Sequence, residues 1–225
     1  MAHTGRAEIY FSVDVEADGP IPGPYSMVSF GAAVAGVRDK AFLPRDPSDA
    51  TFYRELRPIS DDFDPAALAV SGLERQKLLT DGTEPRAAMT DFVTWVTAAA
   101  TAAGGARPVV VAYPACYDWM FLYWYLLRFT GGSPFGHSGC LDLKTLYATK
   151  AGIALTGATK RTMPRHLLSK RRHTHHALDD AIEQGEMFAN LMAWDGRLTG
   201  GRPQRRRPTA GTGSGRAASC SRPSP

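Results

Sequence analysis

The sequence predicts an α/β protein in which a mixed β-sheet is covered by helices. Three observations support this class. The first 56 residues contain segments with the two-residue periodicity of strands, much of the remainder has helical periodicity, and residues 109–113 form a short continuous apolar run between two helical segments. A run of this kind is typical of a strand buried in a sheet with helices on its faces.

The expected strands come early in the chain. Residues 9–15 alternate between polar and apolar side chains, and residues 25–34 follow a turn that is rich in Gly and Pro. Residues 51–56 are a third expected strand. Because short, polar, proline-containing connections join the three segments, we expect an antiparallel meander.

The expected helices follow these strands. Residues 65–70 predict a short helix, and residues 84–103 predict a longer one with apolar side chains at helical spacing and two glycines after it. Residues 118–129 predict an aromatic-rich helix directly after the buried strand, and residues 178–194 predict the last helix, which stops at Gly196.

Length and composition indicate one folded domain and a tail. The chain has 225 residues, 44% of them hydrophobic and 21% charged, which is enough for a substantial core and excludes a collagen-like or wholly disordered protein. After Gly196 there are seven arginines and no acid, and after Leu198 there is no large apolar residue to offset the entropy of ordering. We therefore expect a domain over residues 1–196 and a disordered basic tail, rich in Gly, Pro, Arg and Ser, over residues 197–225.

The sequence favours a cytoplasmic protein without a membrane segment. The first ten residues lack the features of a signal peptide, and the longest apolar run is far shorter than the ~20 residues that cross a bilayer. The three cysteines form no close-spaced pair, which is typical of a reducing compartment.

Charge is unevenly distributed within the expected domain. Residues 1–196 carry 19 basic and 22 acidic side chains, yet residues 143–178 contain eight basic residues and no acid. One interpretation is a solvated basic loop. The other is a track for a polyanion, because clustered Lys and Arg bind phosphates and release their counterions.

Two carboxylates are expected at the end of the first strand. Asp14 and Glu16 are two residues apart, so both leave the same face of a strand. Like charges held this close repel unless a cation lies between them. The alternative is that the strand simply ends at solvent.

Two further aspartates precede helical patterns. Asp118 follows the buried strand, where it can cap a helix, contribute to a site, or do both. Asp142 begins another helical pattern and is interpreted as a cap.

A histidine-rich turn leads into the last expected helix. His175 and Asp180 are five residues apart, so both can converge on one site. His173 and His176 lie beside them, but their spacing is not a common one for tetrahedral zinc. A surface cluster without a function is the alternative.

Three motifs together resemble the DEDD-type 3′–5′ exonucleases of the histidine subclass (DEDDh), a group that includes ribonuclease T and oligoribonuclease. The motifs are Phe-Ser-Val-Asp-Val-Glu at residues 11–16, Ala-Tyr-Pro-Ala-Cys-Tyr-Asp at residues 112–118, and His-His-Ala-Leu-Asp-Asp-Ala at residues 175–181. The resemblance implies a ribonuclease H-like fold, a mixed five-stranded sheet with helices on both faces. Ala17 and Pro114 depart from the commoner pattern of the family.

The resemblance also implies a mechanism. Two Mg²⁺ or Mn²⁺ ions would promote hydrolysis of a phosphodiester bond and release nucleoside 5′-monophosphates from a 3′ end. By resemblance, Asp14 would bridge both ions, Glu16 and Asp180 would complete the site of the attacking water, and Asp118 would hold the second ion. His175 would take the proton from the water.

The implied substrates are the 3′ ends of single-stranded RNA or DNA, without a preference readable from the sequence. The basic segment leads straight into His175, so we expect Lys170, Arg171 and Arg172 to bind the nucleic acid beside the scissile bond. Some relatives are dimers, so a homodimer is one arrangement that the resemblance allows.

Two alternatives belong to other functional classes. The first is a catalytically silent nucleic-acid-binding module of the same fold. The second is a zinc-binding protein that uses the cluster of His173, His175 and His176.

Overall fold

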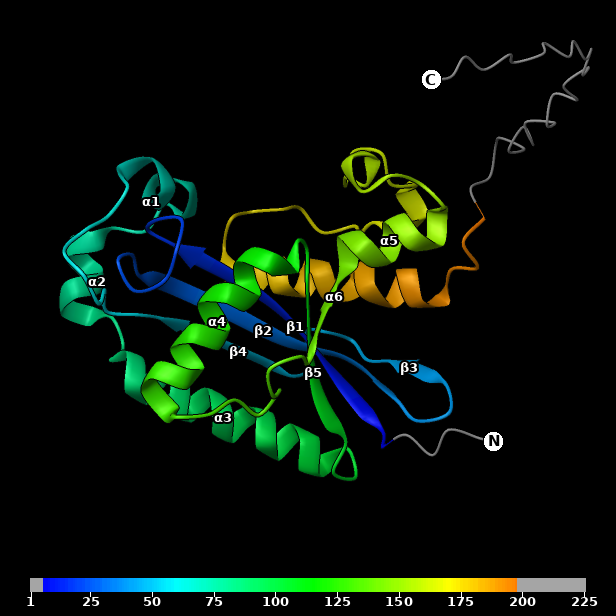
Figure 1. Ribbon diagram of the computed structural model, residues 1–225, viewed down its shortest axis with the longest axis horizontal. Helices are drawn as coiled ribbons and strands as arrows, with labels where there is room; N and C mark the ends of the chain where they lie inside the picture. The colour runs from blue at the N-terminus through cyan, green and yellow to red at the C-terminus, as the bar shows by residue number, and fades with distance from the viewer. Residues whose placement is uncertain (1–5, 198–225) are drawn as a thin grey trace, which may run out of the picture.

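A computed structural model of the protein describes residues 6–197 (Figure 1). The predicted tail beyond Arg197 lies outside the described residues. The sheet contains six strands: β1 (Glu8–Ala17), β2 (Met27–Arg38), β3 (Phe42–Pro44), β4 (Thr51–Glu55), β5 (Arg107–Ala112) and β6 (Cys140–Asp142). The α-helices of the described residues are α1 (Pro65–Ser71), α2 (Arg75–Asp81), α3 (Pro85–Ala102), α4 (Ala115–Thr130), α5 (Leu143–Ala151) and α6 (Ala177–Ala193).

The sheet is mixed and five strands wide. The strand order is β3-β2-β1-β5-β6, and β4 pairs with the part of β2 that β3 leaves free. β1 is antiparallel to β2 and parallel to β5, and β6 extends the parallel part. The predicted meander is confirmed in β1, β2 and β4, and the predicted buried strand is β5.

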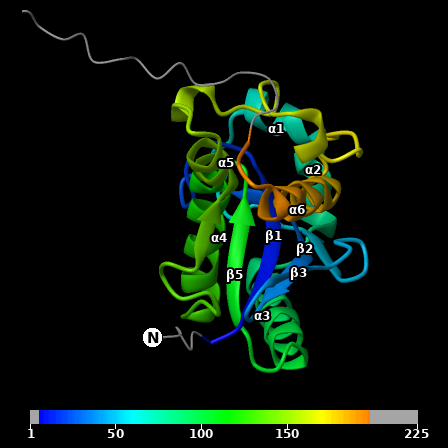
Figure 2. The same cartoon turned by 90° about the vertical axis from the view of Figure 1, so that its right-hand side faces the viewer.

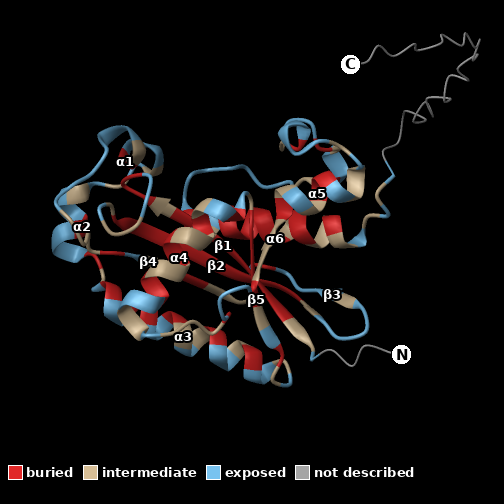
Figure 3. Cartoon of the chain, in the orientation of Figure 1, coloured by how far each residue is buried: buried red, intermediate tan, exposed pale blue. Residues whose placement is uncertain are grey.

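Helices cover both faces of the sheet, as predicted. α3 and α4 pack on the face of β1 that carries Phe11, Val13 and Val15, whereas α5 and α6 pack on the face that carries Tyr10 and on Val109 and Val111 of β5. Figures 1 and 2 show α3 and α6 on opposite sides of the strands. Burial is concentrated on the central strands and on the faces of the helices that meet them (Figure 3).

The start of α4 differs from the sequence prediction. The helix begins at Ala115 rather than at 118, so Asp118 lies in the first turn and is not the N-cap. Asp142, in contrast, is confirmed as a cap. Its Oδ1 accepts a hydrogen bond from Thr145 N of α5 at 2.6 Å, and its Oδ2 accepts one from Ala115 N at 2.7 Å. Asp142 therefore holds the starts of two helices together.

A glycine on β2 allows α6 to lie directly on the sheet. Gly31 pairs with Asp14 across the β1–β2 ladder. A Cβ atom at Gly31 would overlap the main chain of Ala177 and Leu178, at the first turn of α6. The absent side chain thus brings the start of α6 against the strand segment that carries the predicted acids.

No helix within residues 6–197 combines the length and the apolar character that a membrane crossing requires.

Substituting Gly31→Ala is expected to lower the free energy of unfolding by about 1–3 kcal/mol, because overpacking forces α6 away from β2. Gly132→Ala is the matched control, since Gly132 faces open space, and it should change stability by less than about 0.5 kcal/mol. Chemical denaturation of both variants measures the difference. Equal stabilities for the two variants would contradict the close packing at Gly31.

Candidate active site

Two carboxylates project from the central strand, and a third reaches them from the last helix. Asp14 and Glu16 lie near the end of β1, on one face. Asp180 lies in the first turn of α6. Oxygen atoms of the three side chains lie within 4.8 Å of one another, close enough to hold one metal ion. The structure therefore brings these three predicted residues together from opposite ends of the described chain.

The carboxylate of Asp180 is fully buried and is held by the loop before α6. Its Oδ1 accepts a hydrogen bond from Thr174 N at 3.0 Å, and its Oδ2 accepts one from His175 N at 2.9 Å. His175 has a φ of 58°, a left-handed conformation that is uncommon for a residue with a side chain. Asp180 thus fixes the loop that presents His175.

The side chain of His175 is exposed and lies beside the Asp180 carboxylate. Its ring centroid is 4.5 Å from that of His173, and ring nitrogens of both residues lie within 4.8 Å of an Asp180 oxygen and of each other. His173 Nδ1 also lies 3.0 Å from Asp180 Oδ1 and 3.2 Å from Glu183 Oε2. His175, the predicted general base, therefore lies next to Asp180, one of the four predicted carboxylates.

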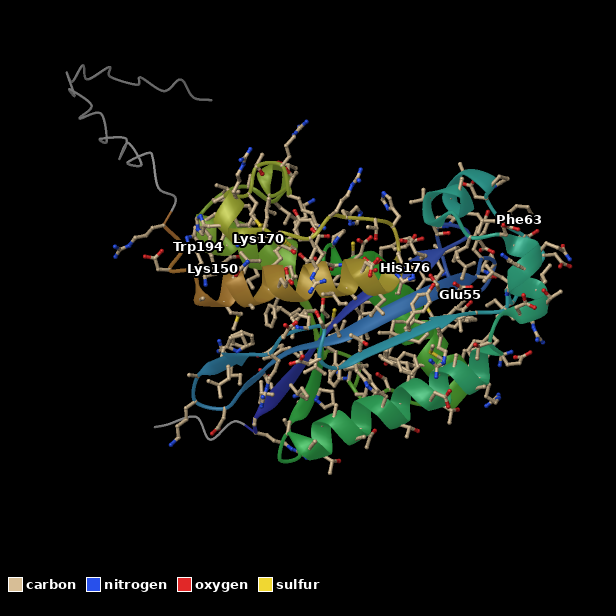
Figure 4. The ribbon with its side chains drawn as sticks, turned by 180° about the vertical axis from the view of Figure 1, so that it is seen from behind. Glu55, Phe63, Lys150, Lys170, His176 and Trp194 are labelled. Atoms are coloured by element: carbon tan, nitrogen blue, oxygen red, sulfur yellow. The ribbon has the colours of Figure 1, made fainter. Side chains whose placement is uncertain are left out.

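His176 takes a different direction from the other two histidines. Its ring stacks on Tyr53 with 4.6 Å between the ring centroids. Figure 4 shows His176 at the start of α6, near Glu55 at the end of β4. The three histidines of the zinc alternative do not converge, because only His173 and His175 gather with Asp180.

Asp118 approaches the same group from α4. The pairing of β1 with β5 ends at Ser12, so the edge of β1 beyond this residue is open on that side. There Val15 N donates a hydrogen bond to Asp118 Oδ1 at 3.0 Å. Val15 is the residue between Asp14 and Glu16, and the charge of Asp118 helps to raise the pKa of both. The fourth predicted carboxylate therefore joins the other three.

These carboxylates repel one another in a poorly solvated place. Burial, together with Asp180 and Asp118, raises the pKa of Glu16 to about 7. Burial also raises the pKa of Asp118 to about 7. The pKa of Asp14 is raised by burial and by its three carboxylate neighbours, and Lys160 opposes this shift. A bound cation would offset the repulsion among these carboxylates.

Sequence reasoning missed two residues at this site, of which Gln184 touches Asp14 and Lys160 acts on the pKa of Asp14 through its charge. Gln184 Nε2 donates a hydrogen bond to Asp14 Oδ1 at 2.7 Å. Lys160 Nζ donates one to Glu183 Oε2 at 2.7 Å. Gln184 comes four residues after Asp180, so both residues lie on one face of the helix. This spacing could have identified Gln184 as a neighbour of the site. No local pattern singles out Lys160, which comes from a loop.

Two of the three predicted nucleic-acid-binding residues, Lys170 and Arg171, lie along α6 rather than at its start. Arg171 is held by two hydrogen bonds, because its Nε donates to Glu186 Oε1 at 2.7 Å and its Nη2 donates to Ser48 Oγ at 2.8 Å. Lys170 and Arg172 are exposed and make no ion pair within residues 6–197. Glu186 follows Asp180 by six residues, or about 9 Å along a helix axis. In Figure 4, Lys170 is correspondingly far from His176.

Comparisons with known proteins agree with this geometry. No family model matches the chain. The chain is 38% identical to the 3′–5′ DNA exonuclease Cap18 of Escherichia coli over 183 residues, which make up 80% of this chain and 90% of that protein. The fold of this chain is similar to that of the nuclease domain of 3′hExo, a DEDDh family member bound to rAMP. The TM-score is 0.61 at 12% identity, and the match covers 82% of this chain and 92% of that chain. The fold is also similar to that of E. coli Exonuclease I in complex with a dA16 oligonucleotide, with a TM-score of 0.54, 16% identity, and coverage of 82% and 40%.

The sheet and its helices therefore have the architecture of the exonucleases with a ribonuclease H-like fold. The chain belongs to the DEDDh-type 3′–5′ exonuclease family. It is accordingly a 3′–5′ exonuclease that acts on nucleic acid, as the resemblance implied.

The raised pKa of Glu16 predicts an unusual dependence of stability on pH in metal-free protein. The folded state holds this proton more tightly than the unfolded chain, where the pKa is 4.5. The contribution of Glu16 to the free energy of unfolding is therefore complete below about pH 4.5 and is lost as the pH rises through about 7. Glu16→Gln, which cannot ionise, should raise the melting temperature at pH 8 by about 2–4 °C.

Melting curves in the presence of a chelator test this expectation, with Glu74→Gln as the control because Glu74 is exposed and its side chain caps no helix. A Glu16→Gln variant that melts at or below the temperature of the wild type at pH 8 would contradict the raised pKa of Glu16.

Proposed function

We propose that the protein uses two divalent ions, Mg²⁺ or Mn²⁺, to remove nucleoside 5′-monophosphates from the 3′ end of single-stranded DNA. The observation that carries this proposal is the convergence of carboxylates from β1, α4 and α6 next to His175. The hydrogen-bonded position of each aspartate supports a preformed site.

The donor set fits hard divalent ions. Asp14, Glu16 and Asp180 offer only oxygen ligands within one small volume, and Asp118 adds a carboxylate beside them. Mg²⁺ and Mn²⁺ prefer such ligands, whereas zinc sites favour nitrogen and sulfur. The ions would lower the pKa of a bound water and stabilise charge on the phosphate oxygens. Their binding would also offset the mutual repulsion of the acids.

The proposed role of His175 is to accept the proton of the attacking water. Its exposed ring is presented to solvent while its backbone N–H is fixed by Asp180. An imidazole suits this role because histidine is the side chain that most often serves as a general base in catalysis. General-base assistance of this kind contributes about 10²–10⁴ in rate.

The proposal of DNA as the substrate rests on the similarity of this chain to known exonucleases. The E. coli relative at 38% identity is named a DNA exonuclease, and Exonuclease I, which has a similar fold, is bound to a dA16 oligonucleotide. The exposed basic residues Lys170 and Arg172 favour a polyanionic strand. Lys170 lines a cavity of about 640 Å³, together with Arg45, Arg165 and other residues.

A single-stranded DNA 20-mer labelled at its 3′ end should lose the label first, as a 5′-mononucleotide, and a 5′-labelled one should shorten stepwise. The reaction should stop with a chelator and resume with Mg²⁺ or Mn²⁺. A matched RNA 20-mer should be degraded more slowly. Product that carries a 3′-phosphate, or undiminished cleavage in the chelator, would contradict the proposed chemistry, and binding without cleavage would support the catalytically silent alternative.

Substitutions in the same assay distinguish residues that the reaction requires from neighbouring residues that it does not require. His175→Gln should lower kcat by about 10²–10⁴, and Asp180→Asn should abolish cleavage. Asp179→Asn is the matched control, because Asp179 is the exposed neighbour of Asp180. Loss of activity in Asp179→Asn equal to that in Asp180→Asn would show that the site has been placed wrongly.

We also propose that Lys170 and Arg172 contact DNA phosphates, whereas Arg171 mainly braces the loop against Glu186. Replacing Lys170 and Arg172 by Ala should reduce the salt dependence of single-strand binding by a slope of about 1.4, at ~0.7 for each phosphate contact. Arg171→Ala should mainly lower the melting temperature.

The control for this experiment removes the same charge elsewhere. Arg107 lies at the opposite end of the sheet from Asp14, and Arg128 lies in the last turn of α4. Their double substitution by Ala should leave the slope within about 0.3 of the wild type. Identical slopes for both double variants would exclude Lys170 and Arg172 from the DNA track.

A further inference from the structure

We propose that Gln184 is a positioning residue for Asp14, which it holds in the orientation that binds the divalent ion. This inference rests on the proposed function, in which Asp14 is a metal ligand. Gln184 would touch neither ion nor substrate and would act only through the Asp14 carboxylate.

The contact that carries the inference is short and partly buried. Gln184 lies on α6 one turn after Asp180, and the residue is 1% exposed. Its Nε2 donates to Asp14 Oδ1 at 2.7 Å. Among residues 6–197 this is the one hydrogen bond that the Asp14 carboxylate receives. A single helix therefore supplies both a carboxylate of the group and the side chain that orients another.

Each aspartate of the group has a hydrogen-bond donor of its own. Asp180 accepts from two backbone amides of the histidine loop, and Asp118 accepts from Val15 N. These donors are main-chain N–H groups, which remain in place when any residue other than proline is substituted there. Asp14 differs, because its donor is a side chain. A substitution of Gln184 can therefore change the orientation of the Asp14 carboxylate while the carboxylate itself is kept.

The choice of an amide at this position is explained by Asp14. Gln184 Oε1 is buried and has no hydrogen-bond partner within the described residues. An amide that is only half satisfied is unfavourable in a helix packed on a sheet, and an apolar side chain would avoid the cost. The hydrogen bond to Asp14 is what the amide provides and an apolar side chain cannot.

An uncharged donor also suits a metal ligand. A Lys or Arg at position 184 would neutralise Asp14 and compete with the divalent ion. The amide fixes one oxygen of the carboxylate and leaves its negative charge intact. Lys160, the cation that lowers the pKa of Asp14, is instead paired with Glu183 at 2.7 Å. Polar partners that orient metal ligands typically contribute 10–100-fold to metal affinity.

Gln184→Met tests this role, since Met has a similar shape and no donor. Calorimetric titration of the metal-free protein with Mn²⁺, in the absence of DNA, should show affinity about 10–100-fold weaker than in the wild type. The Mn²⁺ concentration for half-maximal cleavage should rise by the same factor. At saturating Mn²⁺, kcat should return to within about threefold of the wild type, and KM for the oligonucleotide should be unchanged.

Asn190→Leu is the matched control for loss of an amide on the same helix. Asn190 donates to the carbonyl oxygens of Leu167 and Leu168, at 3.4 Å each, and touches no acid of the group. It should lower the melting temperature and leave Mn²⁺ affinity unchanged. If Gln184→Met behaves in this way too, Gln184 is a structural residue and the inference is wrong.

Asp14→Asn separates failure of this inference from failure of the proposed function. If Asp14→Asn loses Mn²⁺ binding while Gln184→Met keeps wild-type affinity, only the positioning role is overturned. If Asp14→Asn itself binds Mn²⁺ as the wild type does, Asp14 is not a ligand and the proposed metal site fails.

Discussion

The burial of carboxylates beside one another at the end of the central strand is the constraint on which the rest of the site depends. Burial raises the pKa of Glu16 and of Asp118 to about 7, and the pKa of Asp14 is raised as well. The fold therefore holds these groups together at a cost in stability. Perturbed groups of this kind cluster at functional sites, where a ligand repays the cost. In a 3′–5′ exonuclease, the ligand proposed here is a pair of divalent ions.

The fold imposes this proximity by three separate devices. Gly31 on β2 lets the first turn of α6 lie against the strand, so that Asp180 meets Asp14. The early end of the β1–β5 pairing leaves Val15 N free to hold Asp118. The histidine loop folds around Asp180 and so presents His175. Each device uses the backbone, which explains how acids from distant segments are held against their own repulsion.

The sequence predicted most of this arrangement but not all of it. Alternation in β1 placed Asp14 and Glu16 on one face, and the resemblance of three motifs supplied Asp118, His175 and Asp180. The start of α4 was misplaced because Asp118 resembles a helix cap, whereas the helix begins on Ala115 through Asp142 of a distant segment. β3 and β6 have three residues each, too few for periodicity to be read. The spacing of Gln184 from Asp180 puts both residues on one helix face, but the contact of Gln184 with Asp14 could not be predicted, because Asp14 is 170 positions away.

A crystal structure of the protein soaked with Mn²⁺ tests the proposed metal site most directly, through anomalous scattering from the ions. Two peaks about 3.5–4 Å apart are expected. Oxygens of Asp14, Glu16 and Asp180 should lie about 2.0–2.2 Å from the ion that they share. Manganese bound elsewhere, with these carboxylates uncoordinated, would contradict the proposal that the carboxylates are ligands of the divalent ions.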